Sequence, residues 1–113
     1  MALAAAESSL GTVLVDAAGL TLYAFTPDTG GVPTCVDACA DAWPPAVVDG
    51  EPTVDGVDPA LVTTVEHPAG GTQLVVDGHP LYTFAGDAAP GDVNGHGSGD
   101  VWFAVASDGS LIP

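Results

Sequence analysis

The chain consists mostly of short apolar runs that are broken by residues typical of turns. The runs are rich in Val, Leu, Thr, Tyr and Phe, and clusters of Gly, Pro and Asp separate them, which is the pattern of β-strands joined by turns. We predict strands at residues 12–16, 20–25, 46–48, 61–66, 72–76, 80–84, 101–106 and 110–112. Only residues 36–42 have the composition of a helix, which the following Trp43-Pro44-Pro45 would end. The pattern predicts a mainly antiparallel all-β fold, a small sandwich or an open barrel, with one short helix near residues 36–42.

The predicted strand at residues 20–25 is apolar on both of its faces. Successive side chains of a strand point to opposite sides, so Leu22 and Ala24 lie on one face, and Tyr23 and Phe25 lie on the other. A strand with two apolar faces is typical of the middle of a sheet. We therefore expect this strand to be central.

The motif Tyr-x-Phe-x-x-Asp occurs twice in the chain, at an offset of 59 residues. Its residues are Tyr23, Phe25 and Asp28 in the first copy, and Tyr82, Phe84 and Asp87 in the second. Trp43 and Trp102 are related by the same offset, and residues 11–15 resemble residues 71–75. An internal repeat of this kind indicates two copies of one unit. We predict a flexible leader at residues 1–10 and a single domain at 11–113, with repeats at 11–50 and 71–110 and a connector at 51–70.

The spacing within the motif favours a structural role for its residues. Tyr and Phe two positions apart share one face of a strand, so each copy presents a pair of aromatic rings. We expect these rings to fill the core between two equivalent hairpins, where each Tyr hydroxyl needs a hydrogen-bond partner. Trp43 and Trp102 are expected to be structural residues of the repeat as well. An Asp at the end of a strand commonly accepts backbone N–H bonds and fixes a turn. The alternative is a ligand site of paired rings and two carboxylates, but identical residues in both copies suit a symmetric scaffold better.

The charge of the chain excludes several classes of function. There are 15 acidic residues and no Lys or Arg, which gives a formal net charge of −15. Binding to nucleic acids or to anionic membranes depends on Lys and Arg, so neither is expected. No apolar run approaches the ~20 residues needed to span a bilayer, so direct membrane insertion is not expected either. A constraint on composition, a high-salt origin and an acidic binding surface would each explain the missing basic residues, and we favour the first.

The two cysteines, Cys35 and Cys39, are four residues apart. In a helix this spacing places their Cα atoms about 6 Å apart, which is within the range for a disulfide. A disulfide, two reduced thiols, and soft ligands for copper or zinc together with a histidine are all compatible with the sequence, and we favour the disulfide. The second repeat has no cysteines, so any such feature belongs to the first repeat alone.

The remaining metal-ligand residues show no strong pattern. His67, His79 and His96 lack the spacing of a metal site, and we expect each of them to be a surface residue in a turn. The stretch 92–100 is rich in oxygen ligands and glycine, although it lacks the spacing and the closing Glu of an EF-hand. Calcium binding by Asp92, Asn94 and Asp100 is therefore a hypothesis rather than our main expectation.

No motif of a known catalytic site is present. The sequence has no HExxH, phosphate-binding loop, nucleophile elbow or dinucleotide fingerprint. We therefore expect a protein that is not an enzyme and needs no cofactor. The sequence does not identify a partner.

Taken together, these motifs resemble a known family, the secreted lipoprotein repeat of unknown function, found in predicted bacterial lipoproteins with a Tyr-x-aromatic-x-x-Asp motif. The resemblance covers residues 11–112, and its features are residues 11–14, 22–25 with Asp28, 35–40, 43–45, 78–82, and 86–87 with 90–92. The family implies export to the cell envelope or outside the cell, which agrees with a disulfide between Cys35 and Cys39. It implies no established activity. The chain departs from the family in lacking basic residues and a lipid-attachment cysteine near its start.

These observations predict a non-catalytic secreted or cell-envelope domain with a structural or ligand-binding role. We expect an extracytoplasmic location, with the signal segment absent from this chain. The alternative is an extracytoplasmic metal-handling or redox module that uses Cys35 and Cys39.

Overall fold

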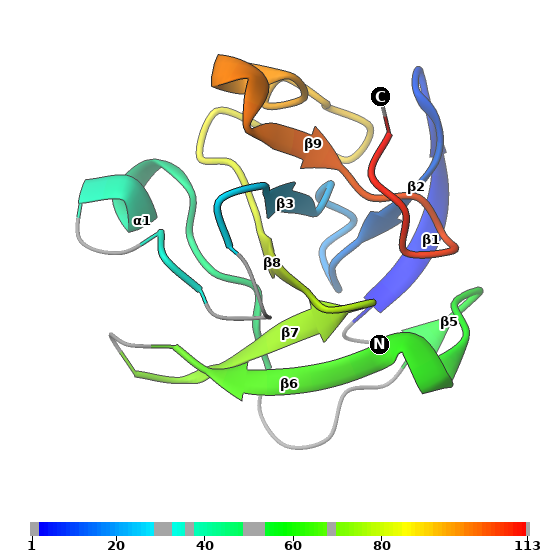
Figure 1. The fold of residues 1–113 in the computed structure, drawn as a ribbon. Coiled ribbons are helices and arrows are strands. Elements are labelled where there is room, and N and C mark those ends of the chain that lie inside the picture. The colour runs from blue at the N-terminus through cyan, green and yellow to red at the C-terminus, as the bar shows by residue number, and fades with distance from the viewer. Residues whose placement is uncertain (1–2, 29–32, 36–37, 49–53, 68–69, 113) are drawn as a thin grey trace.

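The structure is a computed structural model of the 113-residue chain, and it describes residues 3–28, 33–35, 38–48, 54–67 and 70–112. Nearly all of its regular elements are short strands, shown in Figure 1. They are β1 (Leu3–Ser8), β2 (Gly11–Val15), β3 (Tyr23–Phe25), α1 (Ala38–Ala42), β4 (Val47–Val48), β5 (Val54–Asp55), η1 (Pro59–Leu61), β6 (Val62–Glu66), β7 (Thr72–Val76), β8 (His79–Tyr82), η2 (Ser98–Asp100) and β9 (Trp102–Ala104). No helix in these ranges is long and apolar enough to cross a membrane.

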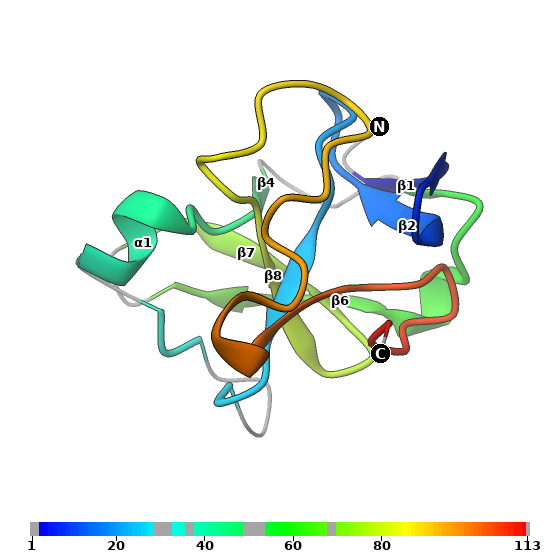
Figure 2. The ribbon, with the colours of Figure 1, turned by 90° about the horizontal axis from the view of Figure 1, so that it is seen from above.

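The strands form two sheets within the described ranges. The smaller sheet has the order β2-β1-β5, and the larger has the order β4-β7-β8-β3-β9 with β6 also paired to β7. All pairings between these strands are antiparallel except that of β1 with β5. In Figure 1 and Figure 2, β1 and β2 lie on the opposite side of the molecule from α1. The prediction of a mainly antiparallel all-β fold with one short helix is confirmed, and in the described part of the chain the sheets do not close into a barrel.

The start of the chain differs from its prediction. Residues 1–10 were expected to form a flexible leader, but Leu3–Ser8 is strand β1, which pairs with the whole of β2. Leu3 is fully buried. This alanine-rich segment has low intrinsic strand propensity, so its pairing and burial decide its conformation. The prediction of a flexible leader is therefore wrong for residues 3–8.

The two halves of the chain have equivalent folds. The hairpin β1–β2 pairs Glu7 with Thr12, and the hairpin β6–β7 pairs Glu66 with Thr72. The equivalence therefore extends upstream of the repeat boundaries at residues 11 and 71 that we predicted from sequence.

Hydrogen bonds outside the hairpins repeat in the same way. The N–H of Leu14 donates to Val105 O at 2.8 Å, and that of Leu74, its counterpart, donates to Ala46 O at 2.8 Å. In the centre of the larger sheet, Tyr23 lies directly opposite its own counterpart, Tyr82, in the antiparallel pair β3–β8. An approximate two-fold axis therefore passes between these two strands.

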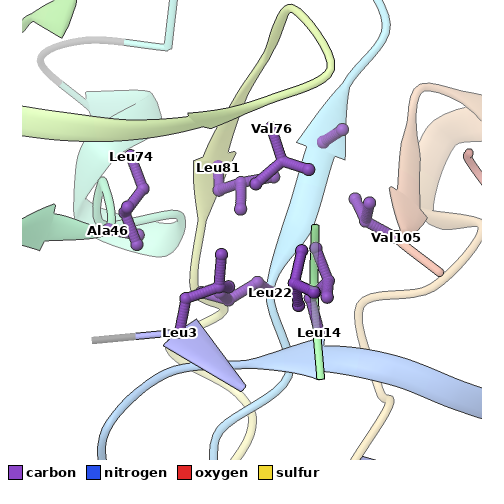
Figure 3. Close-up of a cluster of buried hydrophobic side chains, with 10 residues drawn as sticks. Leu3, Leu14, Leu22, Ala46, Leu74, Val76, Leu81 and Val105 are labelled. Atoms are coloured by element: carbon purple, nitrogen blue, oxygen red, sulfur yellow. The ribbon is translucent and has the colours of Figure 1, made fainter. Parts of the chain in front are cut away.

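The central strands separate two parts of the core. As the alternation of residues predicted, Leu22 and Ala24 belong to an aliphatic cluster, whereas Tyr23 and Phe25 belong to an aromatic one. Figure 3 shows the aliphatic cluster, in which Leu3 from β1 joins Leu22 and side chains from β7 and β8. The prediction that this strand is central is confirmed, because β3 lies between β8 and β9.

The stability of the fold should depend on salt. With a net charge of −15 and no Lys or Arg to neutralise it, the carboxylates repel one another, and dissolved ions screen this repulsion. We expect the melting temperature to rise as sodium chloride is added at neutral pH, measured by circular dichroism. The control is the same titration near the isoelectric point of about 4.1, where the effect should largely vanish. A melting temperature that stays flat or falls at neutral pH would contradict this account.

Candidate functional site

The aromatic residues of the two repeats form a single row of stacked rings. Trp43 and Trp102 lie at its centre, with ring centroids 3.8 Å apart and planes only 3° from parallel. Phe25 stacks on the outer face of Trp102 and Phe84 on the outer face of Trp43, each with centroids 4.3 Å apart. The row is thus Phe25–Trp102–Trp43–Phe84, and the approximate two-fold axis relates its two halves.

The two motif tyrosines contact this row with their ring edges. Tyr23 meets Trp43 at a centroid distance of 5.5 Å, and Tyr82 meets Trp102 at 5.2 Å, both nearly perpendicular. Edge-to-face contacts of this kind are among the preferred geometries of aromatic pairs. Both tyrosines are completely buried, and the two tryptophans are 7 % and 5 % exposed. The rings therefore face inward together.

The hydroxyl of each tyrosine bonds to the carboxylate of the other repeat. Tyr23 Oη donates to Asp87 Oδ2 at 2.6 Å, and Tyr82 Oη donates to Asp28 Oδ2 at 2.7 Å. The two pairs are separated by 64 and 54 residues in the sequence. Each copy of the motif is therefore completed by the other copy.

The second oxygen of each carboxylate holds the loop that follows its strand. Asp28 Oδ1 accepts the N–H of Thr34 at 2.8 Å, and it also accepts the Thr34 hydroxyl. Asp87 Oδ1 accepts the N–H of Asn94 at 3.0 Å. Both carboxylates are buried, at 6 % and 7 % exposure. Each carboxylate thus joins a tyrosine of one repeat to a loop of its own repeat.

Backbone N–H groups also donate to the two phenol oxygens. Gly95 N–H donates to Tyr23 Oη at 3.3 Å, and Cys35 N–H donates to Tyr82 Oη at 3.4 Å. Burial raises the pKa of both tyrosines well above its usual value, and the hydrogen bonds to Asp87 and Asp28 raise it further. The backbone donors act in the opposite direction, but they are weaker. Both phenols are therefore held in their neutral form.

This pKa shift predicts a loss of stability at alkaline pH. Because the folded pKa lies above the unfolded value of about 10, folding favours the protonated phenols. The contribution of the two protonated phenols to the stability of the fold is complete below pH ~10 and is lost as the pH rises above that value. Tyr23 and Tyr82 are the only tyrosines, so phenolate absorbance reports on them alone. We expect this absorbance to appear together with unfolding. Ionisation near pH 10 in a still folded protein would contradict the arrangement.

The first repeat closes its loop with a disulfide. Cys35 and Cys39 are bonded, with Cα atoms 5.1 Å apart, so the disulfide prediction is confirmed. Cys35 is fully buried, and its N–H is the donor to Tyr82. The equivalent donor in the second repeat is Gly95, where an added Cβ would lie 2.6 Å from the Trp43 ring. Glycine there lets the backbone approach the stacked rings.

Two buried polar residues on the second-repeat side were not predicted. Gln73 in β7 is fully buried, and its Nε2 donates to Leu81 O at 2.8 Å. His67, expected in a surface turn, is only 4 % exposed, and its Nε2 lies 3.3 Å from Cys35 O. The one sign of a buried polar residue in the sequence was Gln73 itself, which lies within the apolar run 72–76. The burial of His67 depends on the loop that contains Cys35, which no local pattern reveals.

The other two histidines are less exposed than predicted, although His96 does lie in a turn. His79 is half-buried at the start of β8. His96 is half-buried as well, and its Nδ1 accepts the N–H of Ala104 at 3.0 Å. That bond ties the loop after the second motif to β9, so His96 has a defined structural contact.

The proposed calcium residues lie in the loop between β8 and β9. The Asp92 carboxylate accepts the N–H groups of Ala88 and Ala89 at 2.9 and 3.1 Å, and Asp100 lies in η2. Within the described ranges, no group of three or more His, Cys, Asp or Glu side chains is placed to hold a metal. Calcium binding by Asp92, Asn94 and Asp100 stays a hypothesis, and a calcium titration that leaves the melting temperature unchanged would reject it.

Comparison with known proteins places these residues in a repeat family. A family model described as a secreted repeat of unknown function matches residues 4–47 and 63–106. The two matches correspond to the two halves of the fold, and the first includes most of β1. Neither a curated protein nor a solved structure matches the chain.

Proposed function

Because the chain belongs to a family of secreted repeats of unknown function, we propose that it is a non-catalytic domain of the cell envelope whose paired motifs have a structural role. A single observation carries the proposal. The tyrosines and carboxylates that define the motif are buried and bonded to each other across the two repeats. Groups that satisfy one another in this way hold two half-domains together.

The disulfide is consistent with the same role outside the cytoplasm. It closes the short loop that presents the Cys35 N–H to Tyr82, and such bonds persist in oxidising compartments. A loop this short should contribute less than the ~3 kcal/mol typical of a 15-residue loop. In this proposal the disulfide therefore supports a site that the carboxylates already define.

A thiol assay combined with metal titration tests the proposal against the metal-handling or redox alternative. We expect the native protein to show no free thiol and to take up neither zinc nor copper(I) by calorimetry. The control is the Cys35→Ser/Cys39→Ser double variant, which should unfold at a lower temperature but otherwise behave in the same way. If the reduced protein takes up metal and the double variant does not, the result would favour the alternative. Rapid, reversible exchange of the disulfide with a dithiol while the fold stays intact would also favour it.

A further inference from the structure

Strand β6 lies at a margin of the larger sheet, along the lower edge of the molecule in Figure 1. In the described part of the chain, β6 pairs with β7 alone. Thr63, Thr64 and Glu66 of this strand are exposed. The outer edge of such a strand presents backbone N–H and C=O groups that another strand can bond.

The register identifies which backbone groups point outward. His67 N–H donates to Gly71 O and Asp77 N–H donates to Leu61 O, so both of these residue pairs are hydrogen-bonded pairs of the ladder. Hydrogen-bonded and non-hydrogen-bonded pairs alternate along an antiparallel ladder. Residues 61, 63, 65 and 67 therefore bond toward β7. The N–H and C=O groups of Thr64 and Glu66 and the C=O of Val62 point to the open edge, whereas the N–H of Val62 donates to Pro59 O.

The first repeat shows what this kind of edge accepts. There the equivalent strand, β1, pairs in parallel with β5 through Leu3–Val54 and Ala4–Asp55. In the second repeat, residues 110–112 return toward β9, where Ile112 N–H donates to Ala104 O at 2.9 Å. Among the described residues, the edge is thus occupied in one repeat and open in the other.

The composition of β6 suits an added strand. Val62, Thr63, Thr64 and Val65 are all β-branched, and the strand has neither Pro nor Lys, two of the usual protections of an edge. Acidic side chains lie at both ends. Glu66 is the last residue of β6. At the other end of the strand, the N–H of Asp77 donates to the O of Leu61, the residue that precedes β6. A basic segment would be attracted to these carboxylates.

We propose that the outer edge of β6 binds an extended, Lys- or Arg-rich segment of another polypeptide, added parallel to β6 as β5 is added to β1. Backbone bonds from the C=O of Val62 and from the N–H and C=O groups of Thr64 and Glu66 provide the pairing, and the acidic flanks select a cationic partner. A second copy of this chain is a poor occupant, because each copy has a net charge of −15 and no Lys or Arg.

The probe is a synthetic peptide, acetyl-Lys-Lys-Val-Thr-Val-Thr-Val-Lys-Lys-amide, titrated into the isotopically labelled protein and followed by NMR. In the free protein we expect the amides of Thr64 and Glu66 to exchange with solvent faster than those of Thr63 and Val65. On binding, these two outward amides should become protected, and the affinity should fall as salt is added. Two control peptides, one with Glu in place of every Lys and one N-methylated at alternate residues, should not bind.

The variant Thr64→Pro removes one outward N–H and no bond to β7, so we expect it to fold and to bind the peptide about tenfold more weakly. The matched variant Thr64→Val should bind like the parent. The proposal is overturned if the peptide does not bind, if the N-methylated peptide binds as well as the parent peptide, or if the shifted amides lie elsewhere. If the protein self-associates through β6 and Thr64→Pro blocks this association, the edge binds a second copy of the chain, and the proposal is also overturned. The peptide results decide the question even if Thr64→Pro does not fold.

Discussion

Replacing Trp43 with alanine is expected to lower the free energy of unfolding by about 4 kcal/mol, the largest effect we predict for any single substitution. The ring is 7 % exposed and stacks on Trp102 and Phe84, while the edge of Tyr23 contacts it as well. Its removal therefore leaves a cavity and also ends three aromatic contacts, each of about 0.5–1.5 kcal/mol. The measurement is urea unfolding followed by circular dichroism.

Two control variants show whether the loss comes from the ring stack. Trp102→Ala should cost a similar amount, because the approximate two-fold axis gives it an equivalent place in the row. Val47→Ala, at a side chain that is 52 % exposed, should change the free energy of unfolding by less than about 0.5 kcal/mol. A loss below about 1 kcal/mol for Trp43→Ala would mean that the stacked rings contribute little to stability.

A double-mutant cycle should show that the hydrogen bonds cross between the repeats. Asp87→Asn alone should destabilise the protein by about 2 kcal/mol, because Asp87 accepts both the Tyr23 hydroxyl and the Asn94 N–H. Tyr23→Phe removes the same hydroxyl bond. Once the tyrosine hydroxyl is gone, Asp87→Asn should cost less, so the two effects should overlap by about 1 kcal/mol.

The decisive control is the pair of residues that belong to the same copy of the motif. Tyr23→Phe and Asp28→Asn should be additive within about 0.5 kcal/mol, because Asp28 bonds to Tyr82 and not to Tyr23. Coupling of Tyr82→Phe with Asp28→Asn should match that of the first pair. Strong coupling within each copy, and none between copies, would show that each motif closes on itself.

The sequence was sufficient to predict features that depend on neighbouring residues. Alternation along residues 20–25 predicted the two faces of a central strand, and the Cys35–Cys39 spacing made a disulfide feasible. The repeated motif predicted two equivalent halves and a need for a partner at each buried hydroxyl. These predictions succeeded because strand geometry and turn chemistry act over a few residues. The same locality explains why β1 was missed: its alanines indicate no strand until β2 pairs with them.

Only the tertiary structure decided which groups meet across the two-fold axis. Tyr23 bonds to an aspartate 64 residues away rather than to the one in its own motif, and the repeat itself is compatible with either pairing. The Trp43–Trp102 stack and the burial of His67 likewise depend on segments brought together by folding. The physical reason is that two identical motifs provide identical donors and acceptors, so their local chemistry does not distinguish a bond within a copy from a bond between copies. The antiparallel pairing of β3 with β8 makes that choice, by setting each tyrosine opposite its counterpart.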